Sequence, residues 1–251
     1  MRRKPTSVQA LTELGRVRLS KSFFMRDMLH SEIAQVHGLL NAPDDPDLAI
    51  AAGTRLCEDL LEPLQDHWGR VAVRGAYRNQ EVNALGNRMM RLGKAGYNCA
   101  LNENSAAGHI WDLRDKDGCM GATACVVVPA FYDAHPEPGG WQHLARWIDE
   151  NLPYSWLQFF PKYWAFNINW HERPVRRISS YVEPKGRWVP GQGILTEFEF
   201  QKRDRENVNL RTASGSDPEA YLLPQALADG ACPPASPGAG FVSTSSGSFI
   251  G

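Results

Sequence analysis

Apolar residues recur along the chain at spacings that predict both helices and strands. Between residues 47 and 68 they return every four positions, as at Leu48, Ala52 and Leu56, which is typical of one long amphipathic helix. Pro63 is expected to kink or end that helix because it has no backbone N–H to donate. Shorter helices are predicted over residues 22–30, 80–92 and 141–151, with Ser22 and Asn79 as caps of the first two.

Strands are predicted where β-branched and aromatic residues alternate with polar ones or form short runs. Val71 and Val73 alternate with polar neighbours, and Asp117-Gly118 is typical of a tight hairpin turn. That turn predicts one strand before it, over residues 109–113, and one after it, over residues 122–128. Further strands are expected over residues 69–75, 156–160, 165–171, 178–182 and 194–200.

The segment Phe166-Asn-Ile-Asn-Trp-His171 has a polar face and an apolar face. Alternate side chains of a strand point to opposite sides, so Asn167, Asn169 and His171 are expected to share one face. Such a strand anchors in the core while it presents hydrogen-bonding groups to a site. Taken by itself, the pattern favours a structural histidine that the two asparagines satisfy.

Composition divides the chain into three parts. Residues 1–21 are polar and basic with little periodicity, and they are expected to form an arm or a short helix. Residues 22–200 contain the predicted helices and strands, which indicates a single globular domain. Residues 201–251 turn to Ala, Gly, Ser and Pro, and such a low-complexity tail cannot bury enough apolar surface to order by itself.

Charge and hydropathy narrow the class of protein. Lys and Arg number 27 against 28 Asp and Glu, so this near-neutral chain is not expected to bind nucleic acid through a general basic surface. The sequence contains no apolar segment of the roughly 20 residues that a membrane span needs, and no signal peptide pattern. We therefore expect a product made in the cytoplasm, with the basic arm and the tail as surfaces for assembly partners.

Candidate chemistry is concentrated between residues 105 and 129. This stretch holds His109, Asp112 and Cys125 around glycine turns and runs into an apolar strand. With His171, and with either Asp112 or Cys125, His109 forms a set of three residues that could bind zinc and leave a fourth position for water, because zinc accepts imidazole, carboxylate and thiolate ligands. The alternative for His109 alone is a structural histidine beside a glycine turn.

Three segments in the front half of the chain carry a resemblance to a known family. They are Phe23-Phe-Met-Arg-Asp-Met-Leu29, Leu60-Leu-Glu-Pro-Leu64 and Val71-Ala-Val-Arg-Gly-Ala-Tyr-Arg-Asn79, followed by Asn83. With these segments the chain resembles the M15-type peptidases, the group of D-Ala-D-Ala carboxypeptidases and phage endolysins, over residues 22–183. The resemblance implies a Hedgehog/DD-peptidase-like α+β fold, a small and mostly antiparallel sheet flanked by helices. It also implies one zinc ion and hydrolysis of peptide bonds in peptidoglycan.

The resemblance assigns roles to two residues outside the central stretch. Arg78 matches the family arginine that contacts substrate near the scissile bond, and His171 matches the last zinc histidine. The family has an acidic residue three positions before that histidine, or a histidine two before it, where this chain has Ile168 and Asn169. Glu172 is then the candidate general base, provided that the strand ends at His171.

The central family motif, His-x-x-Gly-x-Ala-x-Asp, fits this chain in two registers. With His109 as its histidine, an insertion brings Gly121-Ala-Thr-Ala-Cys125 into the motif, and Cys125 stands in place of the aspartate ligand. With Gly108 and Asp112 matched instead, no insertion is needed, but Ser105 stands in place of the histidine. We favour the first register, in which Asp112 is a further ligand or a hydrogen-bond partner of the site.

Two functions follow from these residues. The first is a zinc-dependent peptidase of carboxypeptidase or endolysin type that cleaves peptidoglycan peptides after release on lysis or from a phage particle. The second is a catalytically degraded module of the same fold, which binds cell wall or has a structural role in a larger assembly. The first function is the leading expectation from the sequence, and Ile168, Asn169 and the disturbed central motif support the second as the alternative.

Overall fold

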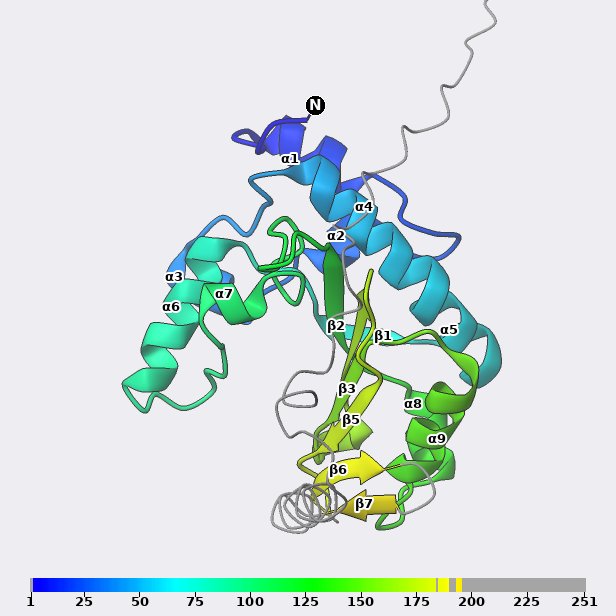
Figure 1. The fold of residues 1–251 in the computed structure, drawn as a ribbon. Helices are drawn as coiled ribbons and strands as arrows, with labels where there is room; N and C mark the ends of the chain where they lie inside the picture. Colours follow the sequence, from blue (N-terminus) through cyan, green and yellow to red (C-terminus); the bar gives the residue numbers. More distant parts are fainter. Residues whose placement is uncertain (1, 184, 190–192, 196–251) are drawn as a thin grey trace, which may run out of the picture.

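The structure is a computed structural model of the chain, and it describes residues 2–183, 185–189 and 193–195. It has an α+β architecture, with helices on both sides of a mixed sheet (Figure 1). The expected α+β class is therefore confirmed. The expected tail over residues 201–251, and residues 196–200 of the last expected strand, lie outside the described residues.

All seven strands of the described residues, from residue 72 onward, belong to one sheet. Its strands lie in the order β1 (Ala72–Gly75), β2 (Gly121–Val127), β4 (Phe166–His171), β3 (Trp156–Phe159), β5 (Arg177–Ser180), β6 (Gly186–Val189) and β7 (Gly193–Leu195). β3 and β5 pair in parallel, and the other neighbouring pairs are antiparallel. The sheet is thus mostly antiparallel, as expected.

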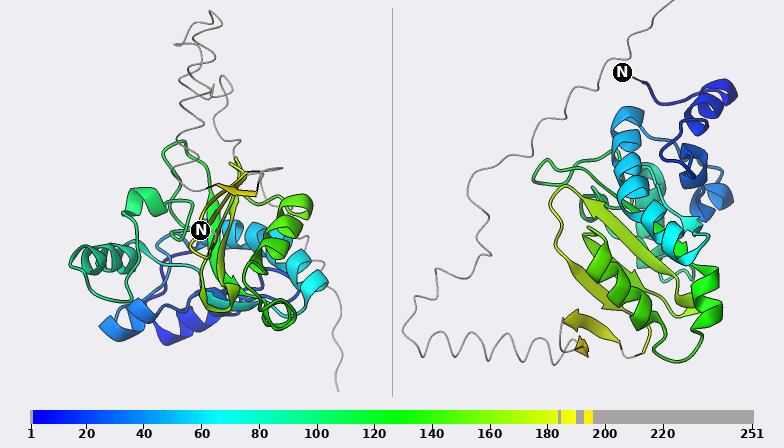
Figure 2. Two further views of the ribbon diagram at one scale, coloured as in Figure 1. Left: turned by 90° about the horizontal axis from the view of Figure 1, so that it is seen from below. Right: turned by 90° about the vertical axis from the view of Figure 1, so that its right-hand side faces the viewer.

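Helices cover the two faces of the sheet unequally (Figures 1 and 2). One side carries α4 (Pro46–Leu56), α5 (Glu62–Trp68), α8 (Pro129–Ala134) and α9 (Trp141–Asn151). The other side carries α3 (Glu32–His37), α6 (Gln80–Arg91) and α7 (Asn102–Ser105), which stand beside β1 and β2 and do not extend to β5 and β6. None of the described helices is both long and apolar enough to cross a bilayer.

The core lies between the sheet and the side that carries α4 and α9. β4 buries Phe166, Ile168 and Trp170 toward these helices, which confirms the expected alternation of that strand. Further core side chains come from β2, β3 and the helices, among them Val126, Leu157, Phe159, Leu56, Phe131, Trp141 and Ile148. Because the core takes one face of each strand, the opposite face is left to polar side chains.

The long helix expected over residues 47–68 is present, but it contains an irregular turn. α4 continues into a π-helical turn at Cys57–Leu61, and α5 follows directly. Pro63 lies in the first turn of α5, so the irregularity comes just before the proline. Glu62, the residue after the π turn, is buried, and its carboxylate accepts a hydrogen bond from Ser20 Oγ at 2.6 Å.

Residues 2–21 pack onto the domain and do not form a free arm. They include α1 (Val8–Gly15), and Leu14 and Leu19 are buried in the core. Their basic side chains meet acidic ones of the same chain in the ion pairs Arg2–Asp47 (2.6 Å), Lys4–Asp44 (2.8 Å) and Lys21–Asp66 (2.6 Å). Half of the six basic side chains of this segment are therefore ion-paired within the molecule.

The cap predicted at Ser22 is wrong. The next helix, α2 (Met25–Met28), begins three residues later with Phe24 as its N-cap. Ser22 instead donates hydrogen bonds to Glu62 from its backbone N–H at 2.6 Å and from its hydroxyl at 3.0 Å. The serine thus anchors the chain to α5.

The strand predicted over residues 109–113 is also wrong. This segment consists of turns, with a single bridge between Ala106 and Ile110. Its apolar character reflects burial, because Trp111 is fully buried in the core. The turn at Gly118 is present with a φ of 80°, but it leads into β2 without a strand on its other side.

Candidate functional site

The polar face of the sheet is formed by alternate side chains of β2 and β4. Directly opposite residues in an antiparallel pair lie on the same face. The opposed pairs on this face are Cys125 with Asn167, Thr123 with Asn169, and Gly121 with His171. The structure therefore places the two asparagines and His171 on one side, as the sequence predicts.

The segment between residues 105 and 113 lies over this polar face. Asn169 Nδ2 donates to the carbonyl oxygen of Ala107 at 3.2 Å and to Thr123 Oγ1 at 2.9 Å. Gly121 permits the close approach, because a Cβ there would overlap the same carbonyl oxygen. Asn169 and Gly121 thus fix the loop that carries His109.

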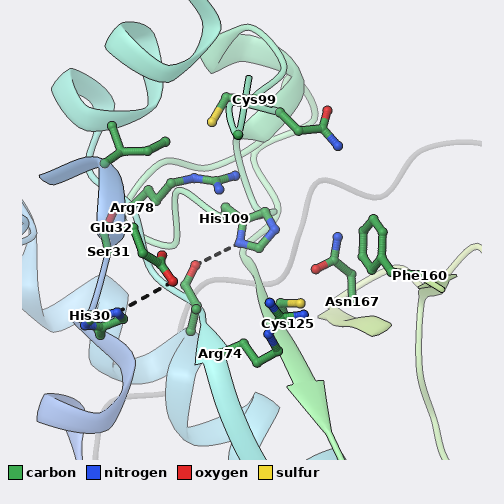
Figure 3. Close-up of a pocket in the computed structure, with 15 residues that line it drawn as sticks. His30, Ser31, Glu32, Arg74, Arg78, Cys99, His109, Cys125, Phe160 and Asn167 are labelled. Atoms are coloured by element: carbon green, nitrogen blue, oxygen red, sulfur yellow. Dashed lines mark hydrogen bonds and ion pairs between the residues drawn. The ribbon is translucent and has the colours of Figure 1, made fainter. Parts of the chain in front are cut away.

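A cavity of about 510 Å³ opens between this face and the α3 side of the molecule (Figure 3). Cys125 and Asn167 line it from the strands, and His109 lines it from the overlying loop. Arg74 and Arg78 line it from the end of β1 and the segment that follows. The remaining lining residues are His30, Ser31, Glu32, Ile33, Gly75, Ala76, Gly96, Asn98, Cys99 and Phe160.

Arg78 is the most unusual group in this cavity. Its backbone N–H donates to the carbonyl of His109 at 2.8 Å, which fixes the side chain beside the histidine. Its Nε is shielded from solvent and has no hydrogen-bond partner, and within the described residues no carboxylate forms an ion pair with its guanidinium. Burial lowers the pKa of Arg78 from its ordinary value. A half-buried guanidinium whose shielded Nε has no partner gains from an anion in the cavity, so the site is poised for an anion.

His109 is held in one orientation and kept neutral. Its Nδ1 lies 2.8 Å from the carbonyl oxygen of Ala76, which accepts the Nδ1 proton and leaves Nε2 as an acceptor. Burial, and next the charge of Arg78, lower the pKa of His109 to about 3. At neutral pH the ring therefore adds no positive charge to the cavity.

Cys125 supplies a thiol on the floor of the cavity. Burial raises the pKa of this thiol, while the charges of Arg74 and Arg78 act in the opposite direction. The net shift is upward, so the sulfur is protonated at neutral pH. Next to one another the cavity therefore has the guanidinium groups of Arg74 and Arg78, the neutral imidazole of His109 and the neutral thiol of Cys125. The Asn167 amide, Glu32, His30 and Cys99 are also among its lining residues.

Asp112 does not face the cavity. Its carboxylate accepts hydrogen bonds from the Tyr77 hydroxyl at 3.0 Å and from the backbone N–H groups of Asp44 and Asp45 at 2.7 and 3.3 Å. Burial raises the pKa of this carboxyl group, and these hydrogen bonds oppose the rise. Asp112 thus ties the segment before α4 to the chain after β1.

His171 and Glu172 lie at the far end of the polar face. His171 Nε2 is 3.1 Å from Asp115, and its Nδ1 accepts from the backbone N–H of Arg173 at 3.0 Å. β4 does end at His171, as the candidate base required. Glu172, however, accepts from the backbone N–H of Met120 at 2.8 Å and does not line the cavity.

The four predicted zinc ligands therefore lie in three places. Cys125 and His171 are four register positions apart along paired strands, about 13 Å at ~3.3 Å per residue. Ligand atoms of one zinc ion lie about 2.0–2.3 Å from the metal, which needs a much closer group. Within residues 2–183, 185–189 and 193–195, no three His, Cys, Asp or Glu side chains are placed to hold a metal ion. His109 and Cys125 line the same cavity, and Asp112 and His171 do not complete a zinc centre with them in this arrangement.

Sequence reasoning identified Arg78, His109 and Cys125, which the structure brings to one cavity. It did not single out Arg74, which reaches the same cavity from β1. The signal for Arg74 was its spacing, because two arginines four positions apart flank the glycine that ends a predicted strand.

No family model matches the chain, and no curated protein or solved structure matches it. The resemblance to the M15-type peptidases therefore rests on the residues quoted above.

Proposed function

We propose that the protein is a binding module that recognises the terminal carboxylate of a cell-wall peptide. The observation that carries this proposal is the half-buried guanidinium of Arg78 in the cavity, whose shielded Nε has no hydrogen-bond partner and which pairs with no carboxylate among the described residues. Arginine matches a carboxylate with two parallel hydrogen bonds, and such charge-assisted bonds are strong where water is excluded. The Asn167 amide and the exposed Arg74 lie within the same cavity to orient the rest of a ligand.

The neutral state of His109 predicts how binding responds to pH. The charge of Arg78 is one of the two causes that lower the pKa of His109. An anion on Arg78 offsets that charge, so the pKa of His109 rises in the complex and the complex takes up a proton in acid. We therefore expect affinity for a carboxylate to increase as the pH falls through the pKa of His109 in the complex, until the ligand carboxylate is itself protonated.

The resemblance supports a peptidoglycan peptide as the ligand. Arg78 stands where the M15-type family has its substrate-contacting arginine, and the mixed sheet flanked by helices is compatible with a Hedgehog/DD-peptidase-like fold. On this proposal the protein acts on cell wall after release by lysis or as part of a phage particle. The low-complexity residues 201–251 are then the proposed contact for partners in the assembly.

The proposal is tested with a wall stem peptide that ends in D-Ala-D-Ala, compared by calorimetry with the same peptide amidated at its C-terminus. We expect the free acid to bind, and Arg78→Gln to weaken it by about thirtyfold, as for a lost charged hydrogen-bonding partner. The matched control is Arg70→Gln, which changes an exposed arginine that does not line the cavity. Equal binding of the acid and the amide, or no effect of Arg78→Gln, would overturn the proposal.

A second candidate function is the zinc-dependent peptidase. The observation in its favour is that His109 and Cys125 line one cavity with Arg78. Its test is metal analysis of the purified chain and of His109→Ala and Cys125→Ala, followed by turbidity of purified cell wall with Glu172→Gln as the variant of the candidate base. About one zinc per chain that both cavity variants lose, with clearing of the wall, would place this function first.

A further inference from the structure

A second cavity lies on the same side of the sheet as the first. It has a volume of about 540 Å³ and is lined by residues of β3, β5 and β6 and the turn that joins the last two. Its basic lining residues are Arg177, Lys185 and Arg187, and its neutral polar ones include Gln158 and Ser179. Unlike the first cavity, it lies on strands that α3, α6 and α7 do not cover (Figure 1).

Register shows that the two cavities belong to one surface. Asn167 of the first cavity is the direct partner of Gln158 of the second, and Gln158 is in turn the partner of Ser179. Opposed residues in neighbouring strands share a face, so these three side chains form a continuous polar row across β4, β3 and β5. All three are half-buried, so the row is open to a ligand.

An aromatic pair joins the same two cavities along their side. Phe160 lines the first cavity and Tyr181 lines the second. Their ring centroids are 5.7 Å apart, and Tyr181 is 49% exposed to solvent. The polar row therefore has an apolar border. A ligand whose side groups lie on both sides of its backbone, such as an extended peptide, can contact the row and the aromatic pair at the same time.

Cationic groups stand at both ends of this row. Arg78 lines the first cavity without an anionic partner, as described above. Arg177 is exposed at the second cavity, and within the described part of the chain its guanidinium makes no hydrogen bond or ion pair. Lys185 adds a cation there, although it also lies 3.4 Å from Glu183.

We propose that these two cavities form one channel for an extended acidic peptide, with its terminal carboxylate on Arg78 and an acidic side chain on Arg177. The proposal rests on the carboxylate site at Arg78 and extends it across the sheet. The path from Cys125 to Ser179 crosses three strand spacings, about 14 Å at ~4.8 Å each. An extended peptide covers that length with four residues at about 3.3 Å per residue.

The lining chemistry favours a peptide over a nucleic acid. The floor between the two cations is neutral, and its amides and hydroxyl can pair with the N–H and C=O groups of a peptide backbone. A nucleic acid carries a charge at every residue and requires a continuous basic track. The near-neutral chain and the two separated cationic ends do not provide one.

The test uses the full chain and two peptides, acetyl-Glu-Ala-Ala-Ala-Ala and acetyl-Gln-Ala-Ala-Ala-Ala, each with a free C-terminal carboxylate. We expect the glutamate peptide to bind about fivefold more tightly than the glutamine peptide, as for an exposed ion pair of good geometry. Arg177→Gln should abolish this difference, while Arg78→Gln should weaken both peptides alike. Arg70→Gln is the control for a loss of one surface charge and should leave both affinities unchanged.

The outcomes separate the channel from the site on which it rests. Equal affinity of the two peptides, with both still dependent on Arg78, would overturn the channel and leave the carboxylate site intact. Absence of binding by either peptide, together with no binding of the wall stem peptide, would overturn both proposals. Displacement of the glutamate peptide by a short oligothymidylate, with a loss of that competition in Arg177→Gln, would assign the surface to nucleic acid instead.

Discussion

The sequence predicted that Arg78, His109, Asp112 and His171 belong to one site, but the structure places them in two kinds of environment. Asp112 and His171 are satisfied by the protein itself, through backbone N–H groups, the Tyr77 hydroxyl and Asp115. His109 and Arg78 line a cavity, and burial shifts their pKa values with little compensation from partners. Residue type alone therefore does not locate a site. A polar side chain is structural where the protein supplies its hydrogen-bond partners, and it is available to a ligand where the protein does not.

The largest expected effect concerns acid stability and His109. The pKa of His109 is about 3 in the folded chain, against 6.5 for an unperturbed histidine, so the unfolded chain binds a proton first as the pH falls. The stability that depends on the neutral ring is complete above pH 6.5 and is lost between there and pH 3. At about 1.4 kcal/mol per pH unit, this loss reaches about 3 kcal/mol by pH 4.

His109→Gln should remove this dependence. Chemical unfolding at pH 7 and pH 4 should therefore show a fall in unfolding free energy that is smaller in His109→Gln than in the natural chain by about 3 kcal/mol. Arg78→Met is the matched variant, since removal of its charge raises the pKa of His109 and gives an intermediate result. An identical pH dependence in all three proteins would mean that His109 is not buried as neutral imidazole.

The next effect concerns Asp112, one of the two residues whose hydrogen-bond partners lie within the protein. Asp112→Ala leaves the buried Tyr77 hydroxyl and two backbone N–H groups without their acceptor. We expect it to lower the unfolding free energy by about 3 kcal/mol, measured by urea denaturation. Asp133→Ala, at an exposed position of α8, is the control and should change stability by less than about 0.5 kcal/mol.

A different result for Asp112 would alter the proposed roles. If Asp112→Ala were as stable as the natural chain and instead lost bound zinc, the carboxylate would be a metal ligand.

The smallest effect is expected at His171. Its side chain is only 15% exposed, but its two partners are an aspartate that is 22% exposed and a backbone N–H. His171→Gln should lower the unfolding free energy by about 1 kcal/mol, as for a partly exposed polar pair. It should leave binding of the wall stem peptide unchanged, because His171 does not line the cavity. Loss of that binding with unchanged stability would mean that His171 contacts the ligand and is not a structural residue.

Local patterns predicted most of the fold. Asn79 caps α6 as expected, with Val82 N–H donating to its side chain at 2.8 Å, because N-cap chemistry is contained in a few neighbouring residues. β3 and β4 were likewise predicted from their alternation. The segment over residues 109–113 was not, because Ile110 and Trp111 are equally apolar whether they are buried in a loop or in a strand.

The candidate site could be predicted only in part, since it depends on distances between segments. The sequence indicated Arg78, His109 and Cys125 correctly as neighbours, but not that Asp115 would pair with His171. It also did not predict that Gln158 pairs with Asn167 and continues the polar row, because the pattern of a single strand does not determine which strands are neighbours.

The π turn at Cys57–Leu61 determines which way α5 is rotated about its axis. Each residue of a helix advances the direction of the side chains by about 100°, so a turn with one extra residue changes the angular phase of everything after it. That phase directs Glu62 inward, where Ser20 and Ser22 bind its carboxylate. The winding of one helix thereby decides where Ser20 and Ser22 attach to the domain.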